Sequence, residues 1–220
     1  MSLPPGRALE LPGRGQTFIR EVQGPAGAPT IFFLHGWTAT ADLNWFTVFD
    51  TLGEHFRIIA PDHRGHGKGI NSKSPFRLED CADDVAAIAD VLGINTFIPV
   101  GYSMGGTIAQ LVWKRHESRV RGLVLCSTAA SFAVSREERL SFLGLTGLAV
   151  LARLTSKQTI EWLTEQLYMQ RKGEGLEPWA IEQMASHDWR KILEAGSAIG
   201  NFDSTSWLKD VDVPASVVIT

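Results

Sequence analysis

One serine, Ser103, lies among glycines in the segment G-Y-S-M-G-G at residues 101–106. An apolar run from Thr96 to Val100 precedes this segment, and a helix-like run from Thr107 to Arg115 follows it. Glycine at the flanking positions fits a tight strand-to-helix turn, because a side chain there would clash with neighbouring backbone. The pattern predicts a nucleophile elbow, in which Ser103 attacks an acyl carbon.

Two other interpretations of the glycine-rich segment stay open. It is also compatible with a structural turn whose serine faces solvent, or with a helix N-terminus that binds phosphate. The absence of a G-x-x-x-x-G-K-[ST] pattern argues against a nucleotide. We expect no cofactor.

A second motif, His35-Gly36-Trp37, follows the apolar run from Thr30 to Leu34. Acyl transfer builds an oxyanion that two backbone N–H groups can stabilise, and Trp37 and Met104 are the expected donors. Gly36 lets the chain bend, as Gly101 and Gly105 do around the serine. His35 is a possible base, but we expect it to hydrogen-bond within its own turn.

A third motif, P-D-H-R-G-H-G at residues 61–67, contains two histidines three positions apart. No third ligand follows at a zinc-like spacing, so we expect turn residues and no metal. Asp62 and Arg64 are expected to brace this loop through hydrogen bonds or ion pairs. Asp83 and Asp84, in a charged first turn of a helix, are expected to be solvated.

The order of apolar runs predicts an α/β fold with a doubly wound, mostly parallel sheet. A hairpin is expected from Ala8 to Leu11 and Gln16 to Val22, because glycine and proline separate the two runs. The other expected strands are Thr30–Leu34, Arg57–Ala60, Thr96–Val100, Val120–Cys126 and Ala215–Ile219. The expected helices between them are Leu43–His55, a stripe from Leu78 to Leu92, and the run after Ser103.

From about Ala130 to Trp207 the alternation stops, which predicts an inserted helical cap. Residues 1–129 would then form the first part of the core, 130–207 the cap, and 208–220 a return strand. Helix starts are expected at Ser135 with Glu138, at Thr155 with Gln158, and at Glu177-Pro178. Apolar cap residues could line an acyl pocket or pack the cap onto the sheet: Phe142, Leu145, Leu148, Trp162, Leu167, Tyr168, Trp179 and Met184.

The composition is that of an ordinary globular protein, with 20% charged and 44% hydrophobic residues and a formal charge of −3. This balance argues against nucleic acid as a partner. The apolar stretch Leu140–Leu154 is too short to cross a membrane. No signal peptide is evident at the N-terminus, and Cys81 and Cys126 are expected to be buried reduced thiols, which predicts a cytoplasmic location. The oligomeric state cannot be derived.

Together the motifs HGW, PDHRGHG and GYSMGG resemble those of the α/β-hydrolase superfamily, in order and spacing, from Ala8 to Cys126. The resemblance implies that Ser103 is the nucleophile and that Trp37 and Met104 form the oxyanion hole. In that family the catalytic acid follows the strand equivalent to Ala215–Ile219, and the histidine comes later still. Neither position exists in this sequence, so the resemblance implies a chain that lacks its last strands and helix.

We therefore expect a serine hydrolase that acts on a small apolar ester or related acyl compound, with acid and base lost beyond residue 220. A chain without them is expected to be inactive or very weak, because a serine hydroxyl needs an imidazole to take its proton. His187, in the cap, is a remote substitute. Carbon–carbon bond hydrolases, thioesterases, perhydrolases and acyltransferases of the same superfamily stay open. The alternative from another class is a non-catalytic protein that binds a small ligand or a partner.

Overall fold

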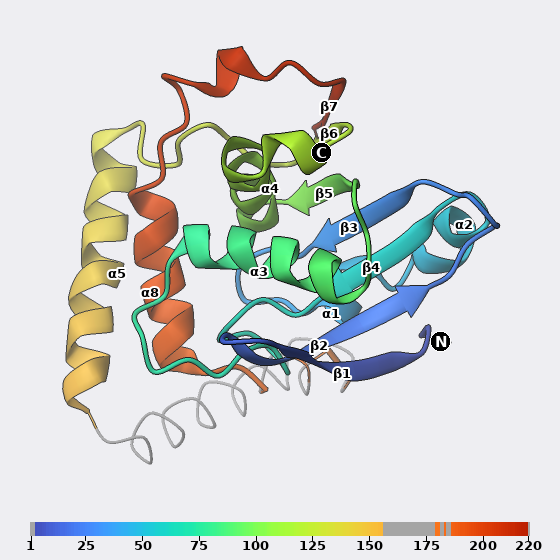
Figure 1. Cartoon of the computed structure of the whole chain (residues 1–220). Helices are drawn as coiled ribbons and strands as arrows, with labels where there is room; N and C mark the ends of the chain where they lie inside the picture. Colours follow the sequence, from blue (N-terminus) through green and yellow to red (C-terminus); the bar gives the residue numbers. More distant parts are fainter. Residues whose placement is uncertain (1–2, 156–178, 181–182, 184–185, 220) are drawn as a thin grey trace.

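The computed structural model describes residues 3–155, 179–180, 183 and 186–219. Its centre is a seven-stranded sheet in the order β1-β2-β4-β3-β5-β6-β7 (Figure 1). The strands are β1 (Gly6–Leu11), β2 (Gly15–Val22), β3 (Thr30–Leu34), β4 (Arg57–Pro61), β5 (Ile98–Tyr102), β6 (Leu123–Cys126) and β7 (Ala215–Val218). Strands β3 to β7 run parallel, while β1 and β2 are antiparallel to their neighbours. The expected α/β fold with a mostly parallel sheet is confirmed.

Both faces of the sheet are covered by helices, which explains why the central strands are apolar on both sides. Helices α3 (Leu78–Val91) and α4 (Met104–Arg115) cover one face, and α1 (Ala41–Trp45) and α2 (Phe49–Gly53) cover the other. Successive residues of β3 alternate between them: Phe32 and Leu34 pack with α3 and α4, and Ile31 and Phe33 pack with α1 and α2. Two hydrophobic cores thus hold β3 and β5 side by side.

Several predicted elements agree with the structure. The hairpin is present, with Leu11 opposite Gly15 across the turn. The last strand also returns to the sheet, because β7 pairs in parallel with β6. All residues of β7 are exposed, as expected for a strand at the edge.

Other boundaries were wrong. The single helix expected over Leu43–His55 is two short helices, since the chain turns between Trp45 and Phe49 so that both rings pack on Phe33. The strand expected at Thr96–Val100 lies two residues later, and the one expected from Val120 begins at Leu123.

Among the described residues between β6 and β7, two long helices run side by side in Figure 1. Helix α5 (Arg136–Leu154) begins with the predicted capping box of Ser135 and Glu138. Helix α8 (Trp189–Gly200) is capped by Asp188, whose side chain accepts from Arg190 N. The other two predicted cap starts, at Thr155 with Gln158 and at Glu177-Pro178, depend on residues outside the described ranges.

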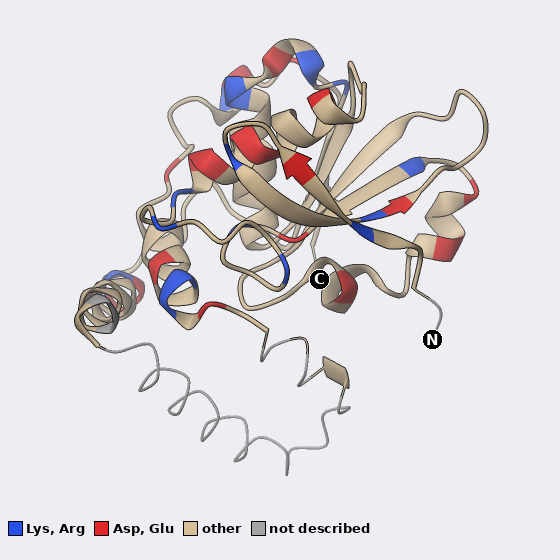
Figure 2. Ribbon diagram, turned by 60° about the horizontal axis from the view of Figure 1, so that its bottom comes forward, with Lys and Arg blue, Asp and Glu red and all other residues tan. Residues whose placement is uncertain are grey.

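Single turns of 3-10 helix occur at Glu117–Arg119 and Leu208–Asp210. Figure 2 shows basic and acidic residues interspersed along the ribbon. In the part of the chain that the structure describes, no helix is both long and apolar enough to cross a membrane. Both thiols are free; Cys81 is buried as expected, but Cys126 is only half-buried.

Candidate active site

Ser103 connects β5 to α4 and has a strained backbone, with φ of 52° and ψ of −116°. A positive φ is unusual for a residue with a side chain. Hydrogen bonds hold this conformation: Ser103 N donates to Cys126 O at 2.9 Å, and Thr128 Oγ1 donates to Ser103 O at 2.8 Å. Ser103 is half-buried between an exposed Tyr102 and a fully buried Met104. This is the backbone geometry of a nucleophile elbow.

Two glycines let the elbow form. A Cβ at Gly101 would lie 2.2 Å from Gly105 O, and a Cβ at Gly105 would lie 1.9 Å from Leu34 O. Because all of these contacts are with backbone atoms, no side-chain rotation could relieve them. The glycines therefore set the distance between α4 and the end of β3.

The His35-Gly36-Trp37 turn lies against this elbow. Strands β3 and β5 are parallel neighbours, with Leu34 paired to Gly101, so both motifs leave the same edge of the sheet. A Cβ at Gly36 would lie 3.1 Å from the Tyr102 ring. Among the described residues, neither Trp37 N nor Met104 N donates a hydrogen bond. The two expected oxyanion donors thus have free N–H groups at the ends of adjacent strands.

His35 is fully buried, and both of its ring nitrogens are engaged. Nε2 accepts from His63 N at 2.9 Å, and Nδ1 lies 2.8 Å from Gly36 O, which fits a neutral ring protonated at Nδ1. Burial lowers the pKa of His35 to about 3. The imidazole holds its turn and has no nitrogen left to act as a base.

Two further contacts position the same turn, and sequence reasoning missed both. Gly36 N donates to Asn44 Oδ1 at 2.7 Å, which ties the turn to α1. The indole Nε1 of Trp37 donates to Ile192 O at 2.8 Å, and its ring leaves no room for a side chain at Gly196. Trp37 therefore joins the turn to α8, although nothing in the local sequence indicates a partner 155 residues away.

Four histidines form one buried cluster, which also was not foreseen. The ring centroids are 4.2 Å apart for His35 and His63, 5.3 Å for His35 and His66, and 5.4 Å for His66 and His187. Nδ1 of His187 accepts from Gly67 N at 2.9 Å, so this histidine is part of the loop's support. Within the described ranges, no set of three or more His, Cys, Asp or Glu side chains is arranged to hold a metal ion.

Burial lowers the pKa of every ring in this cluster, to about 4 for His187 and well below 6.5 for His63 and His66. The unfolded chain therefore binds more protons than the folded chain between the lowered values and about 6.5. The contribution of these neutral histidines to the stability of the folded chain is therefore complete above about pH 6.5. It is lost as the pH falls from there through the lowered pKa values.

Asp62 supports the loop at residues 61–67 from within. Its two carboxylate oxygens accept from Ala41 N and Lys68 N, both at 2.9 Å. Burial raises the pKa of Asp62 to about 6, although these backbone donors lower it. The sign is opposite to that of the histidines, because stability from this group is lost as the pH rises through 6. The predicted brace is present at Asp62.

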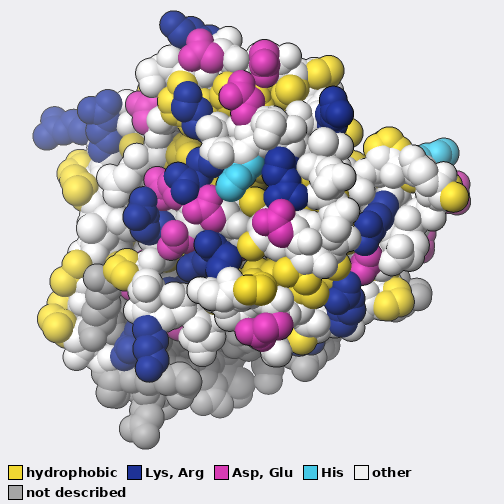
Figure 3. Space-filling view, in the orientation of Figure 1, with side chains coloured by type: hydrophobic (Ala, Val, Ile, Leu, Met, Phe, Trp, Pro, Cys, Tyr) yellow, Lys and Arg dark blue, Asp and Glu magenta, His cyan; other side chains and the backbone are white. Residues whose placement is uncertain are grey.

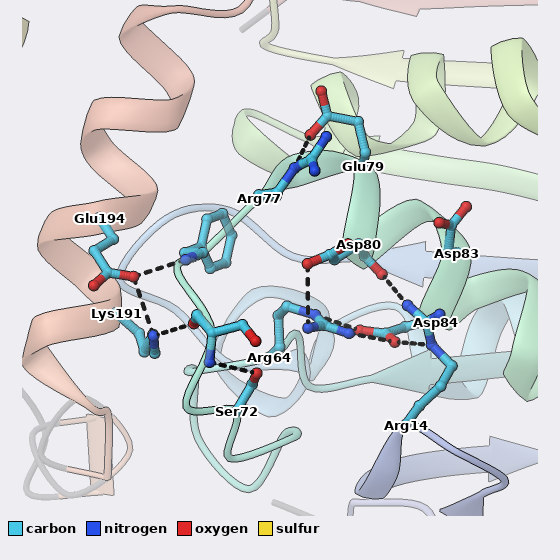
Figure 4. A network of polar contacts seen from close by, with 12 residues as sticks. Arg14, Arg64, Ser72, Arg77, Glu79, Asp80, Asp83, Asp84, Lys191 and Glu194 are labelled. Carbon is cyan, nitrogen blue, oxygen red and sulfur yellow. Dashed lines mark hydrogen bonds and ion pairs between the residues drawn. The ribbon is translucent and has the colours of Figure 1, made fainter.

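Arg64 pairs with a carboxylate that we expected to be solvated. It donates to both oxygens of Asp84, at 2.8 and 2.7 Å, and Arg14 Nε donates to the same carboxylate at 2.6 Å (Figure 4). The prediction for Asp84 was wrong: the helix turns this side chain toward the loop, and only 7% of the residue is exposed. Asp83 is also not free, since it binds Arg115 and His116.

An ion pair within α8, between Lys191 and Glu194, also attaches this helix to the segment that follows the loop at residues 61–67. Lys191 Nζ lies 3.1 Å from Glu194 Oε2 and donates to Ser74 O, and Phe76 N donates to Glu194 Oε2 at 2.7 Å (Figure 4). Both charged residues are buried, at 8% exposure each. Trp37, His187 and Lys191 thus join α8 and the segment before it to the loops around the elbow.

The apolar cap residues that were candidates for lining an acyl pocket differ from one another in their surroundings. Phe142 and Leu145 pack on α8, where their side chains leave no room for a side chain at Gly200 and Gly196. Leu148 is 52% exposed on α5, so it faces solvent and lines no pocket among the described residues. The Trp179 ring lies 5.5 Å from that of Phe46. The other four, Trp162, Leu167, Tyr168 and Met184, lie outside the described residues.

A family model for the alpha/beta hydrolase fold matches residues 29–147, which include all three motifs. This range is more than half of the chain. The protein belongs to the α/β-hydrolase fold family.

Individual relatives agree with this assignment. A bifunctional esterase/perhydrolase from Acinetobacter calcoaceticus is 37% identical over 116 residues, which are 52% of this chain and 42% of the relative. A non-heme chloroperoxidase from Streptomyces lividans is 28% identical over 88% of this chain and 74% of its own length. The crystal structure of an enol-lactonase from Burkholderia xenovorans LB400 is 25% identical and covers 96% of this chain and 80% of its own, with a TM-score of 0.72.

Proposed function

We propose that this chain is the core and cap of a serine hydrolase that acts on a carboxylic ester or related acyl compound, with Ser103 as nucleophile. The observation that carries the proposal is the strained elbow. Ser103 has a φ of 52°, and Gly105, two residues later, packs against the carbonyl of Leu34 at the end of β3. Strain of this kind persists where the surrounding structure maintains it, and it concentrates at functional sites.

In the proposed reaction, Ser103 Oγ forms a bond to the carbonyl carbon while its proton passes to a general base. The carbonyl oxygen becomes an oxyanion, which the N–H groups of Trp37 and Met104 stabilise. The bond to the alkoxide leaving group then breaks, the leaving group takes up a proton, and an acyl-enzyme ester remains on Ser103. Water hydrolyses that ester in a second step.

The proposal requires a base that the described histidines do not supply. No hydrogen bond joins Ser103 Oγ to an imidazole in the described ranges, and the four clustered rings are buried and neutral. We propose that the imidazole and its carboxylate come from residues outside this sequence, and that residues 130–207 form the cap over the site. The names of the relatives, which include an esterase and an enol-lactonase, favour an ester or a lactone as the substrate. The free thiols support a cytoplasmic location.

The test is acyl transfer from p-nitrophenyl esters of increasing chain length, read by the mass of the intact protein. We expect one acyl group per chain on Ser103, formed slowly, and faster with added imidazole as a substitute base. Ser103→Ala should take up none, and Ser127→Ala, which alters another positive-φ serine nearby, should acylate normally. A folded chain that acquires no acyl group at Ser103, with or without imidazole, would contradict the proposal and favour a binding protein.

A further inference from the structure

The outer face of α5 is apolar along its length and has no partner among the described residues. Its exposed large side chains are Leu140, Leu143, Leu148, Val150, Leu151 and Leu154. Leu143 is 65% exposed and Leu154 is 81% exposed. Figure 3 shows hydrophobic side chains along the edge of the molecule where α5 lies in Figure 1. Soluble proteins seldom expose so many neighbouring apolar side chains unless they bind something there.

The opposite face of α5 packs on α8. Phe142 and Leu145 pack on α8, Thr146 Oγ1 lies 2.7 Å from Ser197 Oγ, and Ala149 is buried. The outer stripe is therefore not needed to hold α5 on the protein.

Two glycines interrupt the stripe and leave its middle flat. A Cβ at Gly144 or Gly147 would meet nothing within 4 Å, so neither glycine makes room for another of the described residues. Glycine in a helix interior lowers stability, which makes two of them on an open face costly without a function. A flat strip between leucines accepts the ridge of a second helix at close range.

Leucines occupy matching positions of the stripe in both directions from Gly147, at four and at seven residues. Leu140 and Leu154 lie seven residues on either side, Leu143 and Leu151 lie four residues away, and small Gly144 is matched with larger Val150 at three. If two α5 helices pack antiparallel about a two-fold axis through Gly147, Leu140 meets Leu154 of the other copy and Leu143 meets Leu151, whereas Leu148 has no apolar counterpart because Thr146 faces α8. Such an isologous contact requires one surface to be complementary to itself.

Charge also favours this occupant over a lipid surface. The exposed side chains described on the stripe are all uncharged, and the exposed turn before it has two arginines and two glutamates, Arg136, Glu137, Glu138 and Arg139. Helices that bind anionic membranes place basic residues beside the apolar face. Antiparallel packing also sets opposite ends of the two helix dipoles together.

We propose that the outer face of α5 is a homodimer interface, in which two copies pack their α5 helices antiparallel about Gly147. The stripe is about 21 Å long at 1.5 Å per residue. A contact of this length belongs to the small interfaces typical of transient assemblies, so we expect a dimer at about 100 µM protein and a monomer at about 1 µM.

Sedimentation equilibrium of the full chain tests the association. Leu143→Glu should give a monomer at every concentration, and Val134→Glu, which changes an exposed apolar residue outside α5, should dimerise normally. Because Leu143 meets Leu151 of the other copy only in the antiparallel arrangement, the double variant Leu143→Lys/Leu151→Glu should dimerise again. Circular dichroism shows whether each variant is folded.

Disulfide formation tests the register. Under oxidation, Gly147→Cys should form a covalent dimer, and the parent chain should not. Leu140→Cys should link to Leu154→Cys when the two variants are mixed, but not to itself. A parent chain that is monomeric at 100 µM, a Leu140→Cys chain that links to itself, or a monomer that instead binds neutral lipid vesicles would overturn the proposal.

Discussion

Replacing Gly105 by alanine should force apart the two motifs that form the candidate site. The new Cβ would lie 1.9 Å from Leu34 O, 2.5 Å from Leu34 C and 2.8 Å from His35 O. An ordinary contact is at least 3.4 Å, so the start of α4 must move by about 1.5 Å, which is 3.4 minus 1.9. Overfilling a packed site in this way costs about 1–3 kcal/mol, and a clash with backbone belongs at the upper end.

The measurement is the free energy of unfolding in urea, together with the melting temperature. We expect Gly105→Ala to lower stability by about 3 kcal/mol, or the melting temperature by about 6–12 °C for a chain of this size. Gly144→Ala is the matched control, because it makes the same substitution in a helix where the Cβ meets nothing within 4 Å. That variant should gain about 0.5–1 kcal/mol.

The same shift moves Met104 N away from Trp37 N. Loss of one oxyanion donor typically lowers the rate by about 10²–10³. Gly105→Ala should therefore acylate Ser103 far more slowly than Gly144→Ala does, at a temperature where both are folded. Equal stability and equal acylation in the two variants would show that this close approach is not a constraint, and the reasoning from the elbow would fail.

Three other perturbations follow from the contacts around the site. Asp84→Asn leaves Arg64 without its buried counter-charge and should lower the free energy of unfolding by about 3–5 kcal/mol. Asp83→Asn, at a more exposed ion pair, should lower it by at most about 1 kcal/mol. Similar urea midpoints for the two variants would contradict this assignment. His187→Gln should remove about 3 kcal/mol of the stability that the parent chain loses between pH 6.5 and 4, calculated from a pKa lowered from 6.5 to about 4; an unchanged pH profile would show that this ring does not contribute. Trp37→Phe removes the hydrogen bond to α8 and should cost about 1 kcal/mol in urea unfolding, so an unaltered midpoint would argue against that link.

Sequence patterns predicted the features that are determined by residues close together in the sequence. Apolar runs and glycines gave the strands and the elbow, because a strand-to-helix turn at Ser103 demands small residues nearby in sequence. The capping box at Ser135 was equally local. The helix stripe that placed Cys81 in the core also holds, since burial on one helix face repeats with the helical period.

What sequence reasoning missed depends on contacts between distant segments. Asp84 looked solvated because its helix turn is charged, but Arg14 and Arg64 reach it from two other elements. His187 joins a cluster whose other members precede it by more than 120 residues. Asn44 lies in a stretch predicted as one long helix, so its bond to Gly36 N had no visible signal. Only the packed chain brings such groups together.

The central claim is that Ser103 is a nucleophile held in an elbow. The most direct measurement is labelling by a fluorophosphonate probe in the presence of imidazole, followed by peptide mapping. The account predicts one adduct, on Ser103, that disappears in Ser103→Ala and when the chain is unfolded in urea. An adduct on another residue, or a folded chain that stays unlabelled at Ser103, would contradict it.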